Sequence, residues 1–430
     1  MTTQPPGESP AAATISPRSA TLVGLASLVG AASSYVVLLV AARTLDRAEN
    51  AEFLAFWSLL FWVFGVLAGV QNEATRAVSA RERGADAPAG ATGAENGARV
   101  LPAGLLVGAG VALLLAATSP LWGARVLGDA WVWLVAVVAL AGLAYSGHSA
   151  VAGALAGRRA WTPYAATVAA EPTVRLVLVL AVLVLGATTV GLQTASGAAA
   201  ATWLLLIATT RHVRAGATAR ADVDRATFLR HVGHTLVAGT ASAALVVGFT
   251  VLLRATSDPA EYATAAPFVL AISVTRAPLL VPLTAYQGVA ITHFLAHRDE
   301  GVVRALWPSL RLVLAGGAVA AVAAGLLGPW AMELLFGDGY RVPGGQLALL
   351  TAAAAGLAVL TLTGAAVLAT GRHRAFATGW VLATATSVAL LLVPLPLEAR
   401  GILSLGVGPL VGVVAHAVAL RGAPSAPVKV

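Results

Sequence analysis

The stretch from Trp131 to Ala152, WVWLVAVVALAGLAYSGHSAVA, runs for 22 residues without a charged side chain. A helix of this length rises about 33 Å, enough to cross a bilayer core of about 30 Å. The whole chain has the same character: of its 430 residues, 58% are hydrophobic and 11% are charged, and the mean hydropathy is +0.83. Soluble domains carry about 25% charged residues. The composition therefore predicts an all-α polytopic membrane protein and argues against a water-soluble enzyme.

Twelve apolar runs follow a polar, proline-rich tail at residues 1–19, which we expect to be disordered. The first run starts too late and is too long for a cleaved signal peptide, so we expect it to be retained. The predicted spans are 20–41, 51–70, 100–119, 131–152, 163–187, 190–210, 232–253, 262–286, 306–327, 346–370, 375–394 and 401–420. Only a short turn near 186–191 separates the fifth span from the sixth, and losing one of them would invert everything that follows.

The distribution of positive charge predicts the orientation. The net charge is +8, carried by 26 arginines and Lys429. Eighteen of these cations fall in tails and loops on the side of the N-terminus and six on the other side, while Arg175, Arg276 and Arg311 lie within spans. This imbalance follows the positive-inside rule. It predicts a multi-pass membrane protein with both termini cytoplasmic. The arginine-heavy, lysine-poor, alanine-rich composition is consistent with a GC-rich bacterium, and we expect the protein in the bacterial plasma (inner) membrane. Arginines scattered over short loops do not make a nucleic-acid footprint, so we expect no nucleic-acid partner.

The chain has no cysteine, which excludes disulfides, thiolate metal sites and cysteine nucleophiles. It also lacks a phosphate-cradling glycine-lysine loop, a His-Glu-x-x-His motif and a Gly-x-Ser-x-Gly motif. We therefore expect no enzyme activity, no catalytic residue, no metal and no cofactor.

Three short motifs recur at nearly one offset. The paired stretches are Asp46–Ala51 with Asp258–Ala263, Leu127–Asp129 with Phe336–Asp338, and Leu155–Arg159 with Leu368–Arg374. The first pair is 212 residues apart and the second 209. Six spans per half give both halves the same orientation, which is a parallel repeat. Transporters often bind their substrate between such halves and rock one half against the other. The alternatives are that the repeat is chance, or that it only records a duplication with no present mechanism.

The repeat divides the chain into five parts. These are a cytoplasmic tail (1–19), an N-terminal six-helix lobe (20–210), a basic cytoplasmic linker (211–231), a C-terminal six-helix lobe (232–420) and a second cytoplasmic tail (421–430).

The motifs at the span ends resemble those of a known family. The turn from Ala42 to Phe53 is similar to the short acidic connection between the first two helices of polysaccharide and oligosaccharidyl-lipid flippases. Leu335–Tyr340 resembles their Phe-Gly-x-x-Tyr turn, and Gly371–Arg374 their basic turn after span ten. These flippases form a branch of the multidrug/oligosaccharidyl-lipid/polysaccharide exporter superfamily, which also contains the MATE drug exporters. The resemblance covers about residues 20–420.

That resemblance implies a MATE-like, V-shaped bundle of two parallel six-helix lobes around a central cavity. It implies a lipid-linked glycan of the polyprenyl-pyrophosphate type as cargo, flipped outward across the plasma membrane by alternating access. Membrane lipids are expected partners, and glycan-assembly enzymes are candidate partners.

Charged residues within spans are the candidates for a cargo site, because a charge at mid-membrane is costly and usually faces a cavity or a partner. Glu171 and Arg175 lie four residues apart on one helix face, on either side of Pro172. They are candidates for an anion site with its counter-ion, or for a self-neutralising pair that only packs the bundle. Arg276 has no acidic neighbour in its own span, and its guanidinium suits phosphate oxygens. The alternative is pairing with a carboxylate such as Glu171.

Residues at the predicted cytoplasmic ends of spans have weaker assignments. Gln71, Asn72, Glu73 and Arg76 follow the second span and are candidates for an inner gate, or for an ordinary polar helix end. Arg311 is expected to snorkel toward the head groups. Tryptophans at span ends are expected to act as interface anchors, namely Trp131, Trp133, Trp307 and Trp330.

Three other functions compete with the flippase. An ion-coupled MATE-like drug or metabolite exporter would share the fold, but a cation carrier needs carboxylates and aromatic residues, whereas three arginines and one deep glutamate lie within the spans. A polytopic glycan polymerase or glycosyltransferase would need catalytic acids on the outer side, where the longest expected loop is Gly328–Gly345 with only Glu333 and Asp338. A membrane scaffold without cargo is the third alternative.

Overall fold

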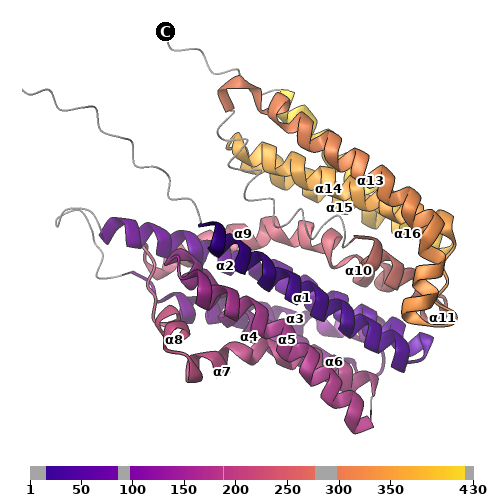
Figure 1. Ribbon diagram of the computed structural model, residues 1–430, viewed down its shortest axis with the longest axis horizontal. Coiled ribbons are helices and arrows are strands. Elements are labelled where there is room, and N and C mark those ends of the chain that lie inside the picture. Colours follow the sequence, from indigo (N-terminus) through magenta and orange to yellow (C-terminus); the bar gives the residue numbers. More distant parts are fainter. Residues whose placement is uncertain (1–15, 86–96, 187, 277–297, 422–430) are drawn as a thin grey trace, which may run out of the picture.

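The computed structural model describes residues 16–85, 97–186, 188–276 and 298–421, and these are almost entirely helical (Figure 1). The first half contains α1 (Pro17–Thr44), α2 (Arg47–Ala85), α3 (Val100–Leu127), α4 (Trp131–Gly157), α5 (Trp161–Gly186), α6 (Thr189–Ala198), α7 (Thr202–Thr209) and α8 (Arg211–Ala217). The second half contains α9 (Arg225–Val246), α10 (Phe249–Thr256), α11 (Pro259–Thr264), a helix Ala266–Arg276, α13 (Arg298–Phe336), α14 (Gly344–Ala369), α15 (His373–Leu391) and α16 (Leu397–Arg421).

Helix length and composition confirm the prediction of an all-α polytopic membrane protein. Within the described ranges, ten helices are long and apolar enough to cross a membrane. The bent pair α9 and α10, with 71° between the two helices, brings the number to eleven if the two helices are counted as one broken span. The remaining predicted span, 262–286, begins with α11 and the helix Ala266–Arg276, and its second part lies outside the described residues.

Local chemistry explains why the fifth and sixth predicted spans are separate helices. α5 ends at Gly186, whose φ of +103° is unfavourable for any residue with a side chain. α6 then begins with Thr188 as its N-cap, because the side-chain oxygen of Thr188 accepts a hydrogen bond from the Gly191 amide at 3.0 Å. The sequence-based separation at 186–191 is therefore correct.

Two helices extend furthest beyond their predicted spans. α2 continues fifteen residues beyond its expected end near Val70 and finishes at Ala85. α13 continues to Phe336, so the connection to α14 is only residues 337–343. The long outer loop expected over Gly328–Gly345 is therefore wrong. An apolar window locates where a span lies in the sequence, but polar residues can extend the same helix beyond it.

The recurring motifs adopt matching conformations in the two halves. Asp46 Oδ1 accepts a hydrogen bond from the Glu49 amide at the start of α2, at 2.8 Å, and Asp258 Oδ1 accepts one from the equivalent Glu261 amide at the start of α11, at 3.4 Å. The turns after α3 and α13 each contain a glycine with positive φ, Gly128 and Gly337.

The third motif pair matches in the same way. The turns after α4 and α14 each contain one residue in the left-handed region, Arg159 with φ of 56° and Gly371 with φ of 76°. Three equivalent turns support a structural relationship between the two halves.

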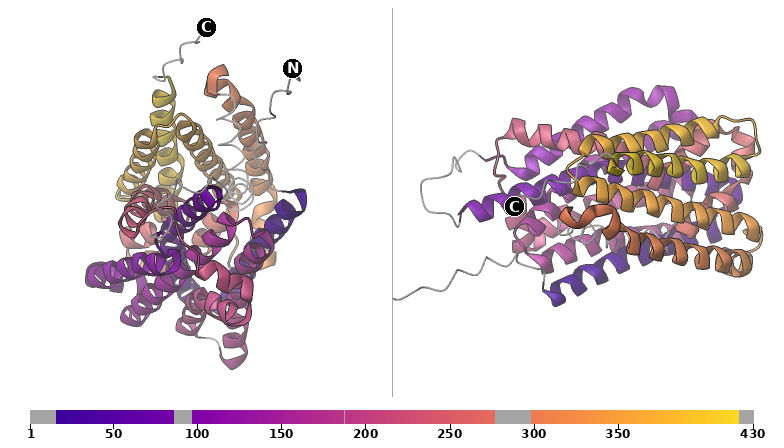
Figure 2. Two further views of the ribbon diagram at one scale, coloured as in Figure 1. Left: turned by 90° about the vertical axis from the view of Figure 1, so that its left-hand side faces the viewer. Right: turned by 90° about the horizontal axis from the view of Figure 1, so that it is seen from above.

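The helices gather into two groups (Figures 1 and 2). In the first group α4 packs against α2 and α3, and α1 packs against α5. In the second, α14 packs against α13 and α16, and α16 against α15. α9 lies between the groups, because it contacts both α2 and α15. We call the end that holds residues 16 and 421 the terminal end and the other the opposite end; in Figure 1 these lie at the left and right.

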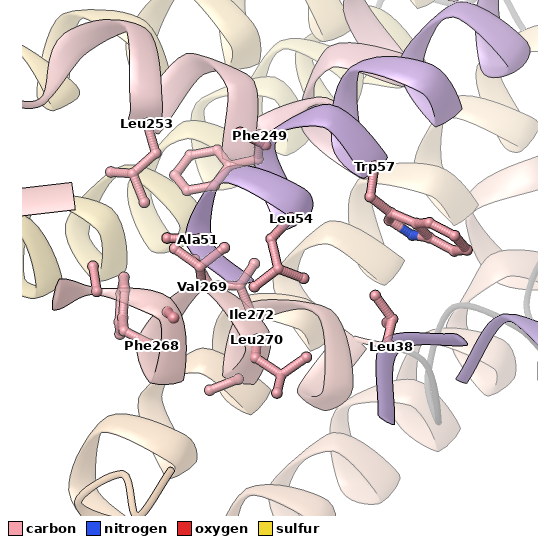
Figure 3. Close-up of a cluster of buried hydrophobic side chains, with 14 of the residues drawn as sticks. Leu38, Ala51, Leu54, Trp57, Phe249, Leu253, Phe268, Val269, Leu270 and Ile272 are labelled. Carbon is pink, nitrogen blue, oxygen red and sulfur yellow. The ribbon is translucent and has the colours of Figure 1, made fainter. Parts of the chain in front are cut away.

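The two groups share an apolar core near the opposite end (Figure 3). Leu38 of α1 and Leu54 of α2 meet Phe249 of α10 and the apolar side chains of the helix Ala266–Arg276 there. Full burial of a large apolar side chain contributes about 1.5–3 kcal/mol. This core therefore stabilises the contact between the halves at that end.

The segment 211–231 is structured and attached to the first half. α8 packs against α4, and Val213 lies in a buried cluster with Val151, Leu155 and Trp203. The backbone of 219–223 pairs with that of 98–100, with hydrogen bonds from the Ala98 amide to Val223 and from the Val100 amide to Ala219. The C-terminal part of the segment is already helical, because α9 begins at Arg225.

Candidate functional site

Glu171 and Arg175 form a buried ion pair on α5. Their exposed fractions are 6% and 1%, and Arg175 Nη2 donates to Glu171 Oε1. Arg175 Nε also donates to the backbone oxygen of Ser196 on α6, at 3.2 Å. The guanidinium is therefore held within the first half, by one charge partner and one carbonyl.

Aromatic rings of α2 enclose the Arg175 guanidinium. Its central carbon lies 5.6 Å from the ring centroid of Trp57, 4.7 Å from that of Phe61 and 5.8 Å from that of Phe64. A cation over an aromatic face is stabilised by the ring quadrupole, most strongly when water is excluded. Phe64 continues the cluster by stacking on Tyr145 of α4, with centroids 3.9 Å apart. These contacts balance the charge of Arg175 within the first half of the chain.

Arg276 is also buried, at 8% exposure, but its surroundings differ. Its Nη1 donates to the backbone oxygens of Leu245 and Val246, at 3.0 and 3.2 Å, and the guanidinium lies 5.3 Å from the Phe249 ring centroid. The break between α9 and α10 leaves carbonyls at the end of α9 without helical partners, and a nearby cation satisfies them. Two prolines that follow Arg276 in the same predicted span, Pro278 and Pro282, lie outside the described residues.

The charge of Arg276 has no acidic partner among the described residues. The pairing with Glu171 that the sequence allowed is not formed, because Glu171 binds Arg175. Arg276 Nε and Nη2 also have no hydrogen-bond partner in the described part of the chain. Among the three deep charges of the cargo-site candidates, Arg276 is therefore the one left without a neutralising charge.

The four inner-gate candidates do not cap a helix end, since α2 continues to Ala85. Gln71 Nε2 donates to Tyr164 Oη of α5 at 3.3 Å, and Asn72 is exposed. Glu73 and Arg76 form an ion pair, with Nη2 and Oε1 2.7 Å apart. The structure therefore separates Gln71 and Asn72 from the charged pair.

Two residues that the sequence analysis missed complete this charged network. His231 Nδ1 of α9 lies 3.0 Å from Glu73 Oε1, and Asp222 Oδ1 lies 3.1 Å from Arg76 Nη2. The network connects α2 to the segment after α8 and to α9. Only a tertiary contact could identify these partners, because they lie about 150 residues away in the sequence.

A second set of polar contacts joins the two halves at the opposite end. Arg43 at the end of α1 donates from Nε to Leu335 O at 2.8 Å and from Nη2 to Leu334 O at 2.5 Å, at the end of α13. Asn50 Nδ2 of α2 donates to Tyr340 Oη at 2.7 Å. The pKa of Tyr340 is raised above its ordinary value, because burial has a larger effect than this hydrogen bond, which acts in the opposite direction. The Phe-Gly-x-x-Tyr motif identifies Tyr340 in the sequence, but it does not identify Asn50 as the partner of Tyr340.

Within the described ranges, no group of three His, Asp or Glu side chains could hold a metal ion.

Comparison with solved structures defines the class of fold. A multidrug resistance MATE family transporter of the MOP superfamily, in an inward-facing conformation, matches with a TM-score of 0.69 and 15% identity, over 95% of this chain and 96% of that one. A MOP superfamily transporter from Pyrococcus furiosus matches with a TM-score of 0.66 and 15% identity, over 94% and 95%. The Vibrio cholerae MATE transporter VcmN matches with a TM-score of 0.61 and 17% identity, over 94% and 97%. The chain is thus a multi-pass membrane protein with the MATE fold.

Sequence comparison gives the narrower relationship, although no family model matches the chain. The uncharacterized protein Rv3630 of Mycobacterium tuberculosis (strain H37Rv) is 41% identical over 401 residues, covering 93% of this chain and 91% of that protein. The uncharacterized protein Rv1510 of the same strain is 38% identical over 403 residues, covering 94% and 91%. The chain belongs to the same family as these mycobacterial proteins.

Proposed function

We propose that the protein is a membrane transporter that flips an anionic, lipid-linked oligosaccharide or polysaccharide precursor outward across the plasma membrane by alternating access. The MATE fold supports a transporter of the MOP superfamily. Arg276 is the observation that favours an anionic cargo, because it is a buried cation without a counter-ion in the described residues, whereas Glu171 is neutralised by Arg175. An arginine fork can bind phosphate oxygens in bidentate geometry.

Energetics favour the proposed direction. Moving one charge across 100 mV is worth about 2.3 kcal/mol, so a pyrophosphate of charge about −2 that leaves a negative-inside cell gains roughly 4–5 kcal/mol. Arg276 would lower the cost of placing that anion at mid-membrane. The Pyrococcus furiosus transporter with this fold is described as having a binding pocket of reverse polarity that suggests a different function. A binding pocket of different polarity on the same fold is compatible with the anionic cargo that we propose.

A MATE-like ion-coupled exporter is the second candidate, because the fold fits it equally well. The specific observation in its favour is the combination of Glu171 with the rings of Trp57 and Phe61, since carboxylates and aromatic rings bind organic cations. In the described structure the guanidinium of Arg175 already occupies that position. A cationic substrate would have to displace it.

The test is translocation of a polyprenyl-pyrophosphate oligosaccharide in proteoliposomes, with the native chain, Arg276→Lys and Arg276→Gln. Both substitutions disturb the guanidinium contacts with Leu245 and Val246, but only Gln removes the charge. We expect Lys to retain a substantial fraction of transport and Gln to lose it at least tenfold, with both variants folded by circular dichroism.

Equal loss in both variants would mean that Arg276 only caps the broken helix. If the native chain fails to move the glycan lipid and instead exports a cationic dye under an ion gradient, the exporter replaces the flippase.

A further inference from the structure

α13 is covered less than the other long helices of the second half. It packs against α14, and both Figures 1 and 2 place it at the edge of the molecule. Its large apolar side chains are exposed along most of its length, including Leu312, Val319 and Leu327. Lipid therefore contacts most of this helix in a membrane.

One face of α13, in the first part of the helix, carries Arg304, Trp307 and Arg311. Their spacing of three and then four residues places them one above another on a helix. All three are exposed, Trp307 at 50%. The central carbon of the Arg311 guanidinium lies 5.0 Å from the Trp307 ring centroid. The two arginines and the indole thus form one continuous surface, which we call the Arg-Trp-Arg face.

The depth of these residues in the bilayer follows from their chemistry. Tryptophan favours the boundary between hydrocarbon and head groups. Arg311 lies one turn further along the helix, about 6 Å deeper at 1.5 Å per residue. A bare guanidinium in hydrocarbon is costly, and folding back over the Trp307 ring brings it toward the head groups. Arg304 lies on the other side of Trp307, so the two cations bracket the head-group level.

Among the described residues the face has no counter-ion, and it continues into an apolar stripe. None of the acidic side chains that the structure describes contacts Arg304 or Arg311. Beyond Arg311, the same side of α13 presents Ala315, Ala318, Val322 and Leu326, all exposed. A ligand that matches both parts has an anionic head and an apolar tail.

We propose that the Arg-Trp-Arg face binds an anionic phospholipid of the surrounding leaflet. The phosphate lies between the guanidinium groups of Arg304 and Arg311, and an acyl chain lies along Val322 and Leu326. This site is independent of the transported cargo and stands whether or not the protein is a flippase.

The experiment is native mass spectrometry of the full chain released from detergent with equal phosphatidylglycerol and phosphatidylcholine. We expect the native chain to retain phosphatidylglycerol preferentially. Arg304→Gln and Arg311→Gln should each lower that retention about fivefold, since a cation near an anionic lipid surface is worth about 1 kcal/mol. Arg311→Lys should lose less than Arg311→Gln. The matched control is Arg230→Gln, which removes an exposed arginine of α9.

Several outcomes would overturn the site. One is equal retention of the two lipids by the native chain, and another is an equal drop in Arg230→Gln. A third is a dimer that forms through α13 without lipid and is lost in the variants, because the occupant would then be a second copy of the chain. If Arg311→Gln does not fold, Arg304→Gln alone decides, since its side chain is exposed in the first two turns of α13.

Discussion

Arg175 and Arg276 are both buried arginines, but different groups surround their charges. Both guanidinium groups are buried and lie over aromatic rings. Arg175 is neutralised by Glu171, whereas Arg276 is held by backbone carbonyls that carry only partial charge. The first arrangement stabilises a packed interface. The second leaves a full positive charge without a counter-ion among the described residues.

The Arg175 environment leads to a prediction about stability. Breaking a buried ion pair from one side costs about 3–5 kcal/mol, because the remaining charge is left unpaired. Arg175→Met and Glu171→Gln should therefore each lower the unfolding temperature markedly. The double variant should be more stable than the sum of the two losses implies, since it leaves no buried charge. Thermal unfolding in neutral detergent measures all three, and strictly additive losses would refute the pairing.

At the scale of helices, small residues of α4 permit its close approach to α2. A Cβ atom added at Gly153 would lie 2.5 Å from the backbone oxygen of Gln71 and 2.7 Å from Ala74 Cβ. A backbone oxygen cannot move aside as a flexible side chain can. Gly356 of α14 offers the contrast, because an added Cβ would meet nothing within 4 Å.

These two glycines give opposite predictions for the same substitution. Gly153→Ala should destabilise the protein by about 1–3 kcal/mol, because the helix pair must separate. Gly356→Ala should stabilise it by about 0.5–1 kcal/mol, because alanine favours the helix and no contact opposes it. Unfolding midpoints of both variants in one detergent check the difference. A similar loss at both positions would contradict close packing as the cause.

At the scale of the whole molecule, the two halves are joined by specific contacts at the opposite end. Arg43 binds the last carbonyls of α13, and Asn50 binds Tyr340. The apolar core of Figure 3 lies beside these contacts. A MATE-like transporter that rocks its halves would have to break them to open this end.

The absence of native cysteine allows a direct test of that opening. Ala51 is fully buried in the core at the opposite end, so Ala51→Cys should react slowly with a water-soluble maleimide. Tyr340→Phe removes a hydrogen bond worth about 1 kcal/mol, and should raise the open population and the labelling rate about fivefold. Arg341→Gln is the control, because Arg341 pairs only with the nearby, partly exposed Glu333, at 3.2 Å, and should change little. Equal acceleration in both variants would argue against Tyr340 as a closing contact.

The sequence by itself determined the membrane-spanning helical fold, the position of most spans and the turns of the repeat. Its apolar runs can be satisfied only by helices in a bilayer, since unpaired backbone groups are too costly there. Glycine and capping residues fixed the ends, as Gly186 and Thr188 show. The polar end of α2 was not predicted. Hydropathy identifies the residues that lie in the bilayer, and it does not show where the helix itself ends.

Only the tertiary structure decided which charges are paired between different helices and segments. Glu171 and Arg175 lie four residues apart, so their contact was foreseeable from the helix period. The carbonyls that hold Arg276 come from another helix. His231 and Asp222, which bind Glu73 and Arg76, likewise come from distant parts of the sequence. The energy of a charge in a membrane depends on every group packed around it, and a linear pattern reports only the neighbours on its own helix.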